Sequence, residues 1–410
     1  MNLRRAILLL FVLQAAMPGK TIDVGLHSTF KTISAGIAAS KAGDTLQVHS
    51  GVYVESALSI SHELILIGLG NPIVDGNHKG EILTVRADKV SIEGFTFKGS
   101  GLSHLDENAA VRFEDAHHGQ ISNNTFEDNF FAIYISKSSN CLIEKNIIHG
   151  KAVSESHSGN AIHMWYCKNV IISGNTISGH RDGIYLEFVE SCEIKDNHSS
   201  NNLRYGLHFM FSNHNQYHDN FFINNGAGVA VMYSRHVDML NNVFADNWGS
   251  AAYGLLLKDI YDSNIIDNQF SRNTVGLYSE ACNRVQIEGN NFENNGWAIK
   301  IMANSMDNIF TRNNFLSNTF DIATNSRQNF NTFSQNYWNR YRGYDLDKDG
   351  IGDVPFRPVK LFSLLTEKNE PTIMLMRSIF VEIMDVAESY IPILTPATLI
   401  DSEPRMHLIP

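Results

Sequence analysis

Two methionines and a histidine are the residues of this chain best suited to bind a soft metal ion. Met210 and Met232 stand at the same place in two consecutive copies of a sequence repeat, and His208 lies two positions before the first of them. Successive side chains of a strand point to opposite faces, so His208 and Met210 share one face. Thioether and imidazole ligands together favour Cu(I) over hard cations. The pattern therefore predicts a copper site on the outward face of a strand.

The strands that position these residues come from an internal repeat of about 22–23 residues. Each copy has a small residue, a short alternating strand, a polar turn and a second apolar strand. The small residues lie at positions 161, 183, 206, 228, 254, 276 and 298. Two longer steps, near 151–158 and 245–251, indicate loop insertions. Short alternating strands at a fixed period favour stacked β-coils over helix pairs. The sequence predicts an all-β fold, a right-handed parallel β-helix; a β-propeller or an irregular sandwich is the alternative.

An Asn closes the second strand of most copies, and an aromatic or aliphatic residue follows two positions later, as in Asn124 with Phe126 and Asn220 with Phe222. Stacked Asn side chains can hydrogen-bond along the axis of the solenoid, and Asn tolerates the left-handed backbone of a sharp corner. The second residue is expected to stack inside the coil.

Four segments are predicted along the chain. They are a signal peptide over 1–19, the β-helix over 20–340, an acidic loop over 341–358, and a C-terminal helix and tail over 359–410. Arg4 and Arg5, followed by an apolar run and small residues, have the order of a secretory signal, and the run is too short to span a bilayer. A small-residue helix at 35–42 is expected to cap the first coil.

The repeat register defines two outward columns of side chains. One column reads Trp165, Glu187, Met210, Met232, Lys258, Glu280 and Met302, and the column two residues earlier reads His163, Tyr185, His208, Ala230 and Leu256. Neighbouring coils lie ~4.8 Å apart, so the two adjacent Met sulfurs can reach a single ion. The alternative interpretation is that these Met side chains pack under a loop or a partner, since Met is common at adaptable apolar surfaces.

The predicted copper ligands are His208, Met210, Met232 and His163. His214 and His236, one coil apart in another column, are weaker candidates. The four cysteines, Cys141, Cys167, Cys192 and Cys282, match no zinc spacing. Cys141 and Cys192 are two coils apart, roughly 10 Å, which is too far for a disulfide. We therefore expect small buried thiols rather than disulfides.

An acidic run after the last repeat predicts a calcium loop. Its proposed ligands are Asp345, Asp347, Asp349, Ile351 and Asp353, with a Gly at the turn. Phe356 stands where an EF-hand has its Glu, so an EF-hand is excluded, while a shorter calcium loop or a solvated acidic turn is not. Residues 361–390 then have the apolar stripe of a helix, with Pro371 in a first turn, which suits either a cover for the last coil or a docking element.

Net charge and the distribution of carboxylates bear on the class of function. The formal net charge of −11 argues against a nucleic-acid partner. Many β-helix proteins are polysaccharide lyases or hydrolases, and others bind carbohydrate, so an enzyme or a carbohydrate-binding protein is the competing class. A hydrolase needs two carboxylates close together, whereas Glu187 and Glu280 lie four coils apart in their column, about 19 Å. The sequence therefore favours a protein that is not an enzyme.

Three runs of residues resemble the NosD family. They are 205–212 (YGLHFMFS), 226–234 (GAGVAVMYS) and the stretch from Asn336 to Asp353, and the similarity extends over essentially the whole chain. The resemblance implies a periplasmic accessory protein for assembly of the copper centres of nitrous oxide reductase. It places His208, Met210 and Met232 at the Cu(I)-handling face.

The same resemblance implies particular partners. In that family the protein works with an ABC transporter, made of a NosY-like membrane subunit and a NosF-like ATPase, and a NosL-like lipoprotein chaperone delivers Cu(I). The sequence has no Gly-rich phosphate-binding loop with Lys, so the energy of nucleotide hydrolysis is expected to come from another chain.

Overall fold

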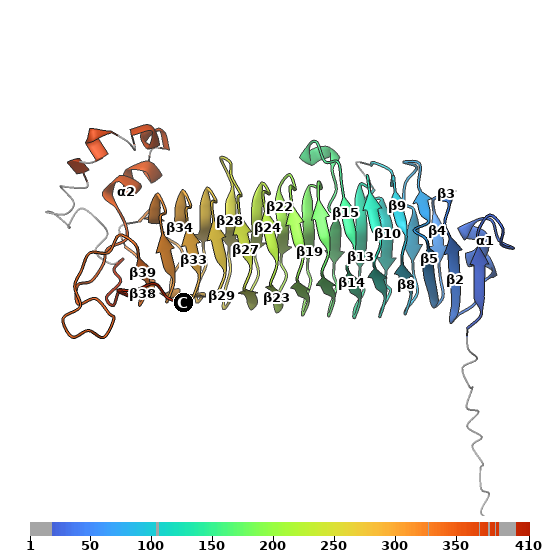
Figure 1. Cartoon of the computed structure of the whole chain (residues 1–410), viewed down its shortest axis with the longest axis horizontal. Coiled ribbons are helices and arrows are strands. Elements are labelled where there is room, and N and C mark those ends of the chain that lie inside the picture. Colours follow the sequence, from blue (N-terminus) through green and yellow to red (C-terminus); the bar gives the residue numbers. More distant parts are fainter. Residues whose placement is uncertain are drawn as a thin grey trace, which may run out of the picture.

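The computed structural model describes residues 19–103, 106–326, 328–368, 370–375, 378–381, 383–384 and 399–410. In this part the chain winds into a long solenoid of parallel coils, with α1 at one end and α2 near the other (Figure 1). The predicted signal peptide falls, up to Pro18, outside the described residues. The predicted fold class is confirmed.

Three parallel sheets form the sides of the solenoid in the described part of the chain. The 14-stranded sheet contains β1 (Thr21–Val24), β2 (Asp44–His49), β5 (Leu64–Leu69), β8 (Ser91–Glu93), β11 (Gln120–Ser122), β14 (Leu142–Glu144), β17 (Ile171–Ser173), β20 (Glu193–Lys195), β23 (Asn215–His218), β26 (Val237–Leu240), β29 (Asn264–Ile266), β32 (Gln286–Glu288), β35 (Ile309–Thr311) and β38 (Thr332–Ser334). The 13-stranded sheet contains β3 (Val52–Val54), β6 (Ile73–Asp75), β9 (Thr96–Lys98), β12 (Thr125–Glu127), β15 (Ile147–His149), β18 (Thr176–Ser178), β21 (His198–Ser200), β24 (Phe221–Ile223), β27 (Val243–Ala245), β30 (Gln269–Ser271), β33 (Asn291–Glu293), β36 (Asn314–Leu316) and β39 (Tyr337–Trp338).

The 12-stranded sheet carries the predicted copper ligands. It contains β4 (Leu58–Ile60), β7 (Leu83–Val85), β10 (Ala109–Glu114), β13 (Phe131–Ser136), β16 (Ile162–Trp165), β19 (Asp182–Glu187), β22 (Tyr205–Met210), β25 (Ala227–Met232), β28 (Tyr253–Lys258), β31 (Val275–Glu280), β34 (Trp297–Ile301) and β37 (Phe320–Thr324). Each strand pairs in parallel with the equivalent strand of the next coil, as β22 does with β25. Side chains one repeat apart are therefore direct neighbours along the solenoid.

A continuous line of Asn side chains runs inside the solenoid, and we call it the first Asn ladder. It consists of Asn124, Asn146, Asn175, Asn197, Asn220, Asn242, Asn268, Asn290, Asn313 and Asn336. In every step, the backbone N–H and the side-chain Nδ2 of one Asn donate to Oδ1 of the next, at 2.8 to 3.2 Å. The predicted hydrogen bonding along the axis is confirmed.

The left-handed corner residue is not the ladder Asn, which corrects the sequence-based expectation. The residue immediately before each ladder Asn has a φ between +52° and +68°, and these residues include Lys145, Asp196 and Arg312. The ladder Asn itself is needed for its side chain, which must satisfy buried backbone groups that no strand pairing reaches. The residue before the Asn thus makes the corner of the backbone, and the Asn side chain makes the hydrogen bonds.

Stacked aromatic rings fill part of the interior. A second line of Asn residues lies nearby, where a column of glycines leaves space for it. Phe222, Phe244, Phe270, Phe292, Phe315 and Trp338 stack with ring centroids 4.1 to 5.6 Å apart. The second Asn ladder consists of Asn202, Asn225, Asn247, Asn273, Asn295 and Asn318. A Cβ on Gly206 would stand 2.9 Å from Nδ2 of Asn225, so the small residue of each repeat makes room for this ladder.

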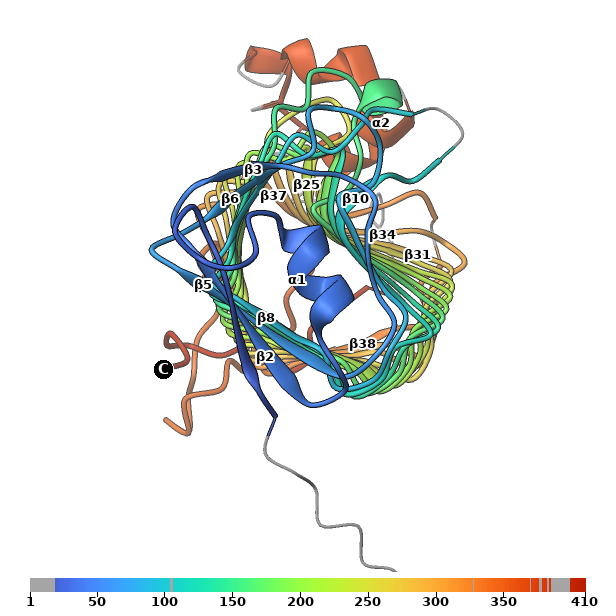
Figure 2. The same cartoon turned by 90° about the vertical axis from the view of Figure 1, so that its right-hand side faces the viewer.

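Helix α1 (Ile33–Ala39) lies across the open end of the first coil, as Figure 2 shows. The Oγ1 of Thr32 accepts a hydrogen bond from the N–H of Ala35, and the Glu55 carboxylate accepts from the N–H groups of Ile33 and Ser34. These contacts satisfy the exposed donors of the helix and place a negative charge at its N-terminus, which stabilises it. The predicted cap is present, although it ends at Ala39 rather than at residue 42.

The far end is covered by C-terminal segments rather than by one long helix. Helix α2 (Leu361–Lys368) packs on β37, and a 3-10 helix η2 (Glu370–Leu375) follows it. The predicted continuous helix over 361–390 is therefore interrupted near Pro371, whose ring removes a backbone donor. Within the described residues, no helix has the length and apolarity needed to cross a bilayer.

Asp401 closes the first Asn ladder from far along the chain. Its buried carboxylate accepts hydrogen bonds from the backbone N–H of Asn336 at 3.1 Å, from Nδ2 of Asn336 at 3.0 Å and from Nε1 of Trp338 at 2.9 Å. Each amide of the ladder points its NH₂ group toward this end, so a carboxylate is the acceptor best suited to the last position. The tail thus completes the last coil.

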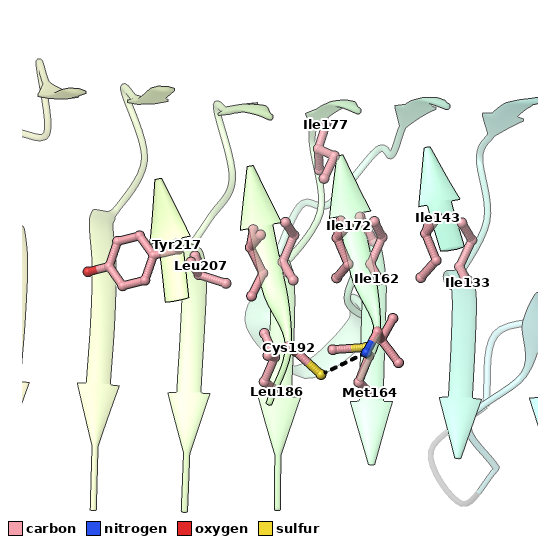
Figure 3. Close-up of a cluster of buried hydrophobic side chains, with 14 of the residues drawn as sticks. Ile133, Ile143, Ile162, Met164, Ile172, Ile177, Leu186, Cys192, Leu207 and Tyr217 are labelled. Carbon is pink, nitrogen blue, oxygen red and sulfur yellow. Dashed lines mark hydrogen bonds between the residues drawn. The ribbon is translucent and has the colours of Figure 1, made fainter. Parts of the chain in front are cut away.

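The four cysteines are buried free thiols, as predicted. Figure 3 shows Cys192 on the inner face, where its sulfur accepts a hydrogen bond from the N–H of Val170 at 3.2 Å. Burial raises the pKa of Cys192 to about 12 and that of Cys282 to about 11, so both stay protonated at neutral pH and are poor metal ligands. The thiols serve as small core residues.

Tyr217 places a hydroxyl in the apolar interior, where no described residue hydrogen-bonds it (Figure 3). Its ring packs against Phe209 at a centroid distance of 5.5 Å. Replacing Tyr217 by Phe is expected to raise the free energy of unfolding by about 1–2 kcal/mol, because the unsatisfied hydroxyl is removed. Urea denaturation measures the change, with Tyr233→Phe at an exposed ring as the control. A loss of stability would contradict this reading of the hydroxyl.

Candidate metal centre

Met210 and Met232 are direct neighbours in the 12-stranded sheet. They are register partners at the ends of β22 and β25, and both side chains are half-buried. The same register places Glu187 beside Met210 and Lys258 beside Met232. The two thioethers therefore form a pair with a carboxylate on one side and an ammonium group on the other, as the sequence columns predicted.

His208 projects from the same face of β22 as Met210, but its ring is not at the surface. The residue is only 4% exposed, and the rings of Tyr185 and Tyr205 contact it at centroid distances of 4.9 and 4.8 Å. Neither ring nitrogen has a hydrogen-bond partner among the described residues. Burial lowers the pKa of His208, although the nearby Asp182 carboxylate opposes that shift, so the imidazole is neutral and can act as a metal ligand.

A buried ion pair lies beside His208. The Asp182 side chain is fully buried, and the guanidinium of Arg204 donates to both of its oxygens, at 2.9 and 2.6 Å. The Nδ1 of His208 lies 3.9 Å from the same carboxylate, which is too long for a hydrogen bond. Burial alone would raise the pKa of Asp182, but the hydrogen bonds and the charge of Arg204 help to hold that pKa below its ordinary value. The Asp182 carboxylate is therefore ionised and neutralised by Arg204, next to a neutral imidazole.

His163 lies too far along the solenoid to share an ion with the methionine pair. Its ring stacks on Tyr134 at 4.5 Å and on Tyr185 at 4.8 Å. Tyr185 separates His163 from His208 in the column, so the two imidazoles are two coil steps apart, roughly 10 Å. Burial lowers the pKa of His163 to about 3. The geometry brings together His208, Met210 and Met232, and leaves His163 as part of an aromatic stack.

His214 and His236 form a stacked pair at a corner of the solenoid. Their ring centroids are 4.7 Å apart with an interplanar angle of 16°, and both residues have a positive φ. They border a shallow groove of about 520 Å³ together with Glu193 and Asp238. The corner lies beyond the end of β22 and ahead of β23, so this pair is separate from the strand face that carries Met210.

The acidic loop brings three of its predicted calcium ligands together. Ligand oxygens of Asp345, Asp347 and Asp349 all lie within 4.8 Å of one another. The carboxylate oxygens of Asp345 also accept hydrogen bonds from the N–H groups of Lys348 and Gly350. Asp353 accepts from the N–H of Leu346, outside this trio, and the calcium site remains a prediction.

Sequence reasoning missed the polar residues around His208. Asp182 occupies the column of Tyr205 and Ala227, where a charged residue stands among aromatic and small ones. The Oδ1 of Asn160 and the Nε of Arg181 are also buried without hydrogen-bond partners among the described residues. A charged residue in an otherwise apolar column was the signal that could have found this cluster.

The described fold matches solved parallel β-helix structures. The mannuronan C-5 epimerase AlgE4 A-module of Azotobacter vinelandii covers 71% of this chain and 85% of its own, with a TM-score of 0.52 and 15% identity. A family 28 exopolygalacturonase of Yersinia enterocolitica covers 76% of this chain and 78% of its own, with a TM-score of 0.59 and 10% identity. At such low identities the likeness establishes the fold alone. The chain is a parallel β-helix protein with an outward methionine pair.

Comparison of the sequence with known proteins finds similarity to one family. The family model described as "Periplasmic copper-binding protein (NosD)" matches residues 144–343, which include Met210 and Met232. A "Probable ABC transporter binding protein NosD" of Pseudomonas aeruginosa is 27% identical over 82% of this chain and 82% of its own. Another of the same name, from Stutzerimonas stutzeri, is 28% identical over 82% of this chain and 81% of its own. The chain is therefore similar to the NosD family over most of its length.

The comparison also bears on the competing enzyme class. The solved β-helix relatives include carbohydrate-active enzymes, whereas the two relatives with significant sequence similarity are named as binding proteins. In this chain Glu187 and Glu280 are separated by three intervening coils, in agreement with the predicted column. These two carboxylates cannot flank one glycosidic bond.

Proposed function

We propose that this protein is a periplasmic accessory protein that handles Cu(I) during assembly of the copper centres of nitrous oxide reductase. The observation that carries the proposal is the register pair Met210 and Met232 with His208 on the same face. The family description and the names of the two relatives support it. In this proposal the protein is not an enzyme, and copper is its cargo.

Transfer proceeds by exchange of ligands at the methionine pair. A lipoprotein chaperone presents Cu(I) to the half-buried thioethers, and His208 completes the ligand set after its covering Tyr205 ring moves aside. The neutral imidazole keeps a lone pair for the ion. Glu187 beside the pair favours a cation, and the ammonium group of Lys258 on the other side is paired with Glu280 at 3.9 Å.

An exposed aromatic stack beside the pair is the proposed contact surface of the chaperone. Tyr166, Phe188, Phe211 and Tyr233 stack along one corner with centroid distances of 4.7 to 5.3 Å. Phe211 and Tyr233 directly follow the two methionines, and all four residues have a positive φ. The positive φ recurs at this corner in neighbouring coils, as at Asp259 and Ala281, and places one side chain of each coil in the same column.

The ABC transporter is the proposed partner of the C-terminal segment. Its described residues expose large apolar side chains, namely Met374, Leu375, Ile379, Phe380 and Ile383. An apolar surface of this kind is typical of an interaction site. A nucleotide-driven change in the transporter then presents competing ligands, and copper passes to the reductase.

Anaerobic titration of the mature protein with Cu(I) against a competing chelator tests the proposal. The double variant Met210→Ala, Met232→Ala is expected to lower the affinity for Cu(I) at least tenfold, about 1.4 kcal/mol, because both thioether ligands are lost. Met306→Ala with Met374→Ala, which removes two exposed methionines elsewhere, is the matched control and is expected to bind as the unaltered protein does. Equal affinities in both double variants would rule out the methionine pair.

A further inference from the structure

A second group of histidines surrounds a small cavity under the inserted segment 151–159. The cavity has a volume of about 120 Å³, and His78, His157 and His180 are among the residues that line it. The inserted segment contains the short 3-10 helix η1 (Glu155–His157), and both views show η1 on the same side of the solenoid as α2 (Figures 1 and 2). A polar space of this size holds several water molecules or an ion.

His180 stands where the second Asn ladder breaks off. Its backbone N–H donates to Oδ1 of Asn202, as each ladder residue does to the next one. Asn129 holds the equivalent place on the other side of the gap, where its Oδ1 accepts from the N–H of Ser100. In the coil between them the chain leaves the solenoid for the insertion. His180 therefore takes a ladder position but cannot make the amide hydrogen bonds of an Asn.

The ring of His180 is arranged as metal-binding imidazoles are. The residue is only 2% exposed, and its Nε2 has no hydrogen-bond partner among the described residues. The backbone of Gly159 hydrogen-bonds the ring, and burial lowers the pKa of His180 to about 4 despite that bond. A neutral imidazole held on one nitrogen by a backbone carbonyl keeps the lone pair of the other nitrogen for a ligand.

No side chain at position 150 covers that nitrogen. A Cβ on Gly150 would stand 2.8 Å from Nε2 of His180, so any other residue at position 150 would cover it. At the rim, Lys151 forms an ion pair with Asp128 at 2.9 Å. The ammonium group is thereby balanced and does not oppose a cation in the cavity.

We propose that this cavity is a second metal site, in which His180 binds one Cu(I) ion through Nε2 and His157 of the inserted segment closes the site. The Nδ1 of His157 is hydrogen-bonded to the hydroxyls of Ser154 and Ser156 at 3.1 and 2.8 Å, which orients the ring. Among the described residues, this cavity holds no group of three His, Cys, Asp or Glu ligand atoms close together, so the proposed site relies on the two imidazoles. The inference rests on the proposed function only for the identity of the metal.

His180→Asn is the decisive variant because Asn is the ladder residue of the following coils. It is expected to fold and to raise the melting temperature, since the ladder is extended by one step. Anaerobic Cu(I) titration with X-ray absorption is carried out on the unaltered protein, on His180→Asn and on Met210→Ala, Met232→Ala. We expect the methionine variant to retain one Cu(I) with only nitrogen and oxygen ligands, and His180→Asn to lose that ion while keeping the sulfur-ligated one.

Each result separates the cavity from the methionine pair. If His180→Asn binds as many Cu(I) ions as the unaltered protein, with unchanged affinities, the cavity site is refuted. If the methionine variant binds no copper, the cavity site is also refuted, and the methionine pair stands. If the methionine variant binds as the unaltered protein does and His180→Asn loses an ion, the cavity site stands and the proposed ligand set of the methionine pair fails.

Discussion

Replacing Asn220 by Ala is expected to lower the free energy of unfolding by about 3–5 kcal/mol. Asn220 is fully buried in the first Asn ladder, and its Oδ1 accepts from both the N–H and Nδ2 of Asn197 at 3.0 Å. Its Nδ2 donates to the carbonyl of Ile194 at 2.9 Å. The substitution leaves the backbone N–H of Asn197 without its partner and removes a donor from Ile194, in a place that strand pairing does not repair.

Urea denaturation followed by circular dichroism measures this loss. Asn339→Ala, at an exposed position, is the control and is expected to change the free energy of unfolding by less than about 0.5 kcal/mol. The cooperativity of a solenoid depends on the contacts between neighbouring repeats. We therefore also expect a broader unfolding transition in Asn220→Ala. A midpoint equal to that of the control would show that water replaces the ladder contacts at no cost.

Replacing Asp182 by Ala is expected to lower the free energy of unfolding by about 3 kcal/mol, because it leaves the Arg204 guanidinium without its buried partner. The value lies at the low end for broken buried pairs, since 32% of the Arg204 side chain is exposed and can be hydrated. The N–H of Tyr205 also loses Asp182 as an acceptor, at 3.3 Å. The ion pair is thus structural support for the strand that carries His208.

Glu114→Ala is the matched control for this second prediction. Glu114 pairs with Arg86 at 2.7 Å on the outside of the same sheet, with both side chains exposed. Exposed pairs contribute little, so a loss of less than about 1 kcal/mol is expected. Similar losses for Glu114→Ala and Asp182→Ala in thermal or urea unfolding would contradict the role of burial in this argument.

The position of the methionine pair could be predicted from the sequence because residues one repeat apart lie side by side in neighbouring coils of a solenoid. Once the repeat length and the alternation of β22 are known, Met210 and Met232 must be register partners, and they are. The same rule gave the column of Trp165 and Glu187. These features depend on backbone pairing alone, which is regular from coil to coil.

The burial of His208 did not follow from the register. Alternation correctly placed His208 on the outer face, but it does not show that the rings of Tyr185 and Tyr205, from the adjacent strand and its own strand, cover it. A repeat predicts which residues lie in a column and not how their side chains pack over one another. The cavity beside His180 did not follow from the register either, since it exists where an insertion interrupts the repeat.

Two other differences show how local chemistry overrides a pattern. The corner φ shifted by one residue because the ladder Asn is engaged in hydrogen bonds, so its neighbour takes the strained conformation. The apolar stripe over 361–390 predicted one helix, but α2 ends at Lys368 and the 3-10 helix η2, which contains Pro371, begins at Glu370. The periodicity of apolar side chains predicts which side of a helix is buried, but it does not predict where the helix ends. A proline, which lacks a backbone N–H, can end it.

The first Asn ladder makes the backbone rigid in the coils that carry Met210 and Met232. Its hydrogen bonds and the strand pairing fix the rise from coil to coil, so the backbones that carry Met210 and Met232 cannot be drawn apart without rupturing several buried bonds together. The two coils therefore keep a fixed spacing at the methionine pair. In the proposed transfer, Cu(I) therefore leaves by rotation of the two flexible thioether side chains toward a competing ligand, while the spacing of the coils is unchanged.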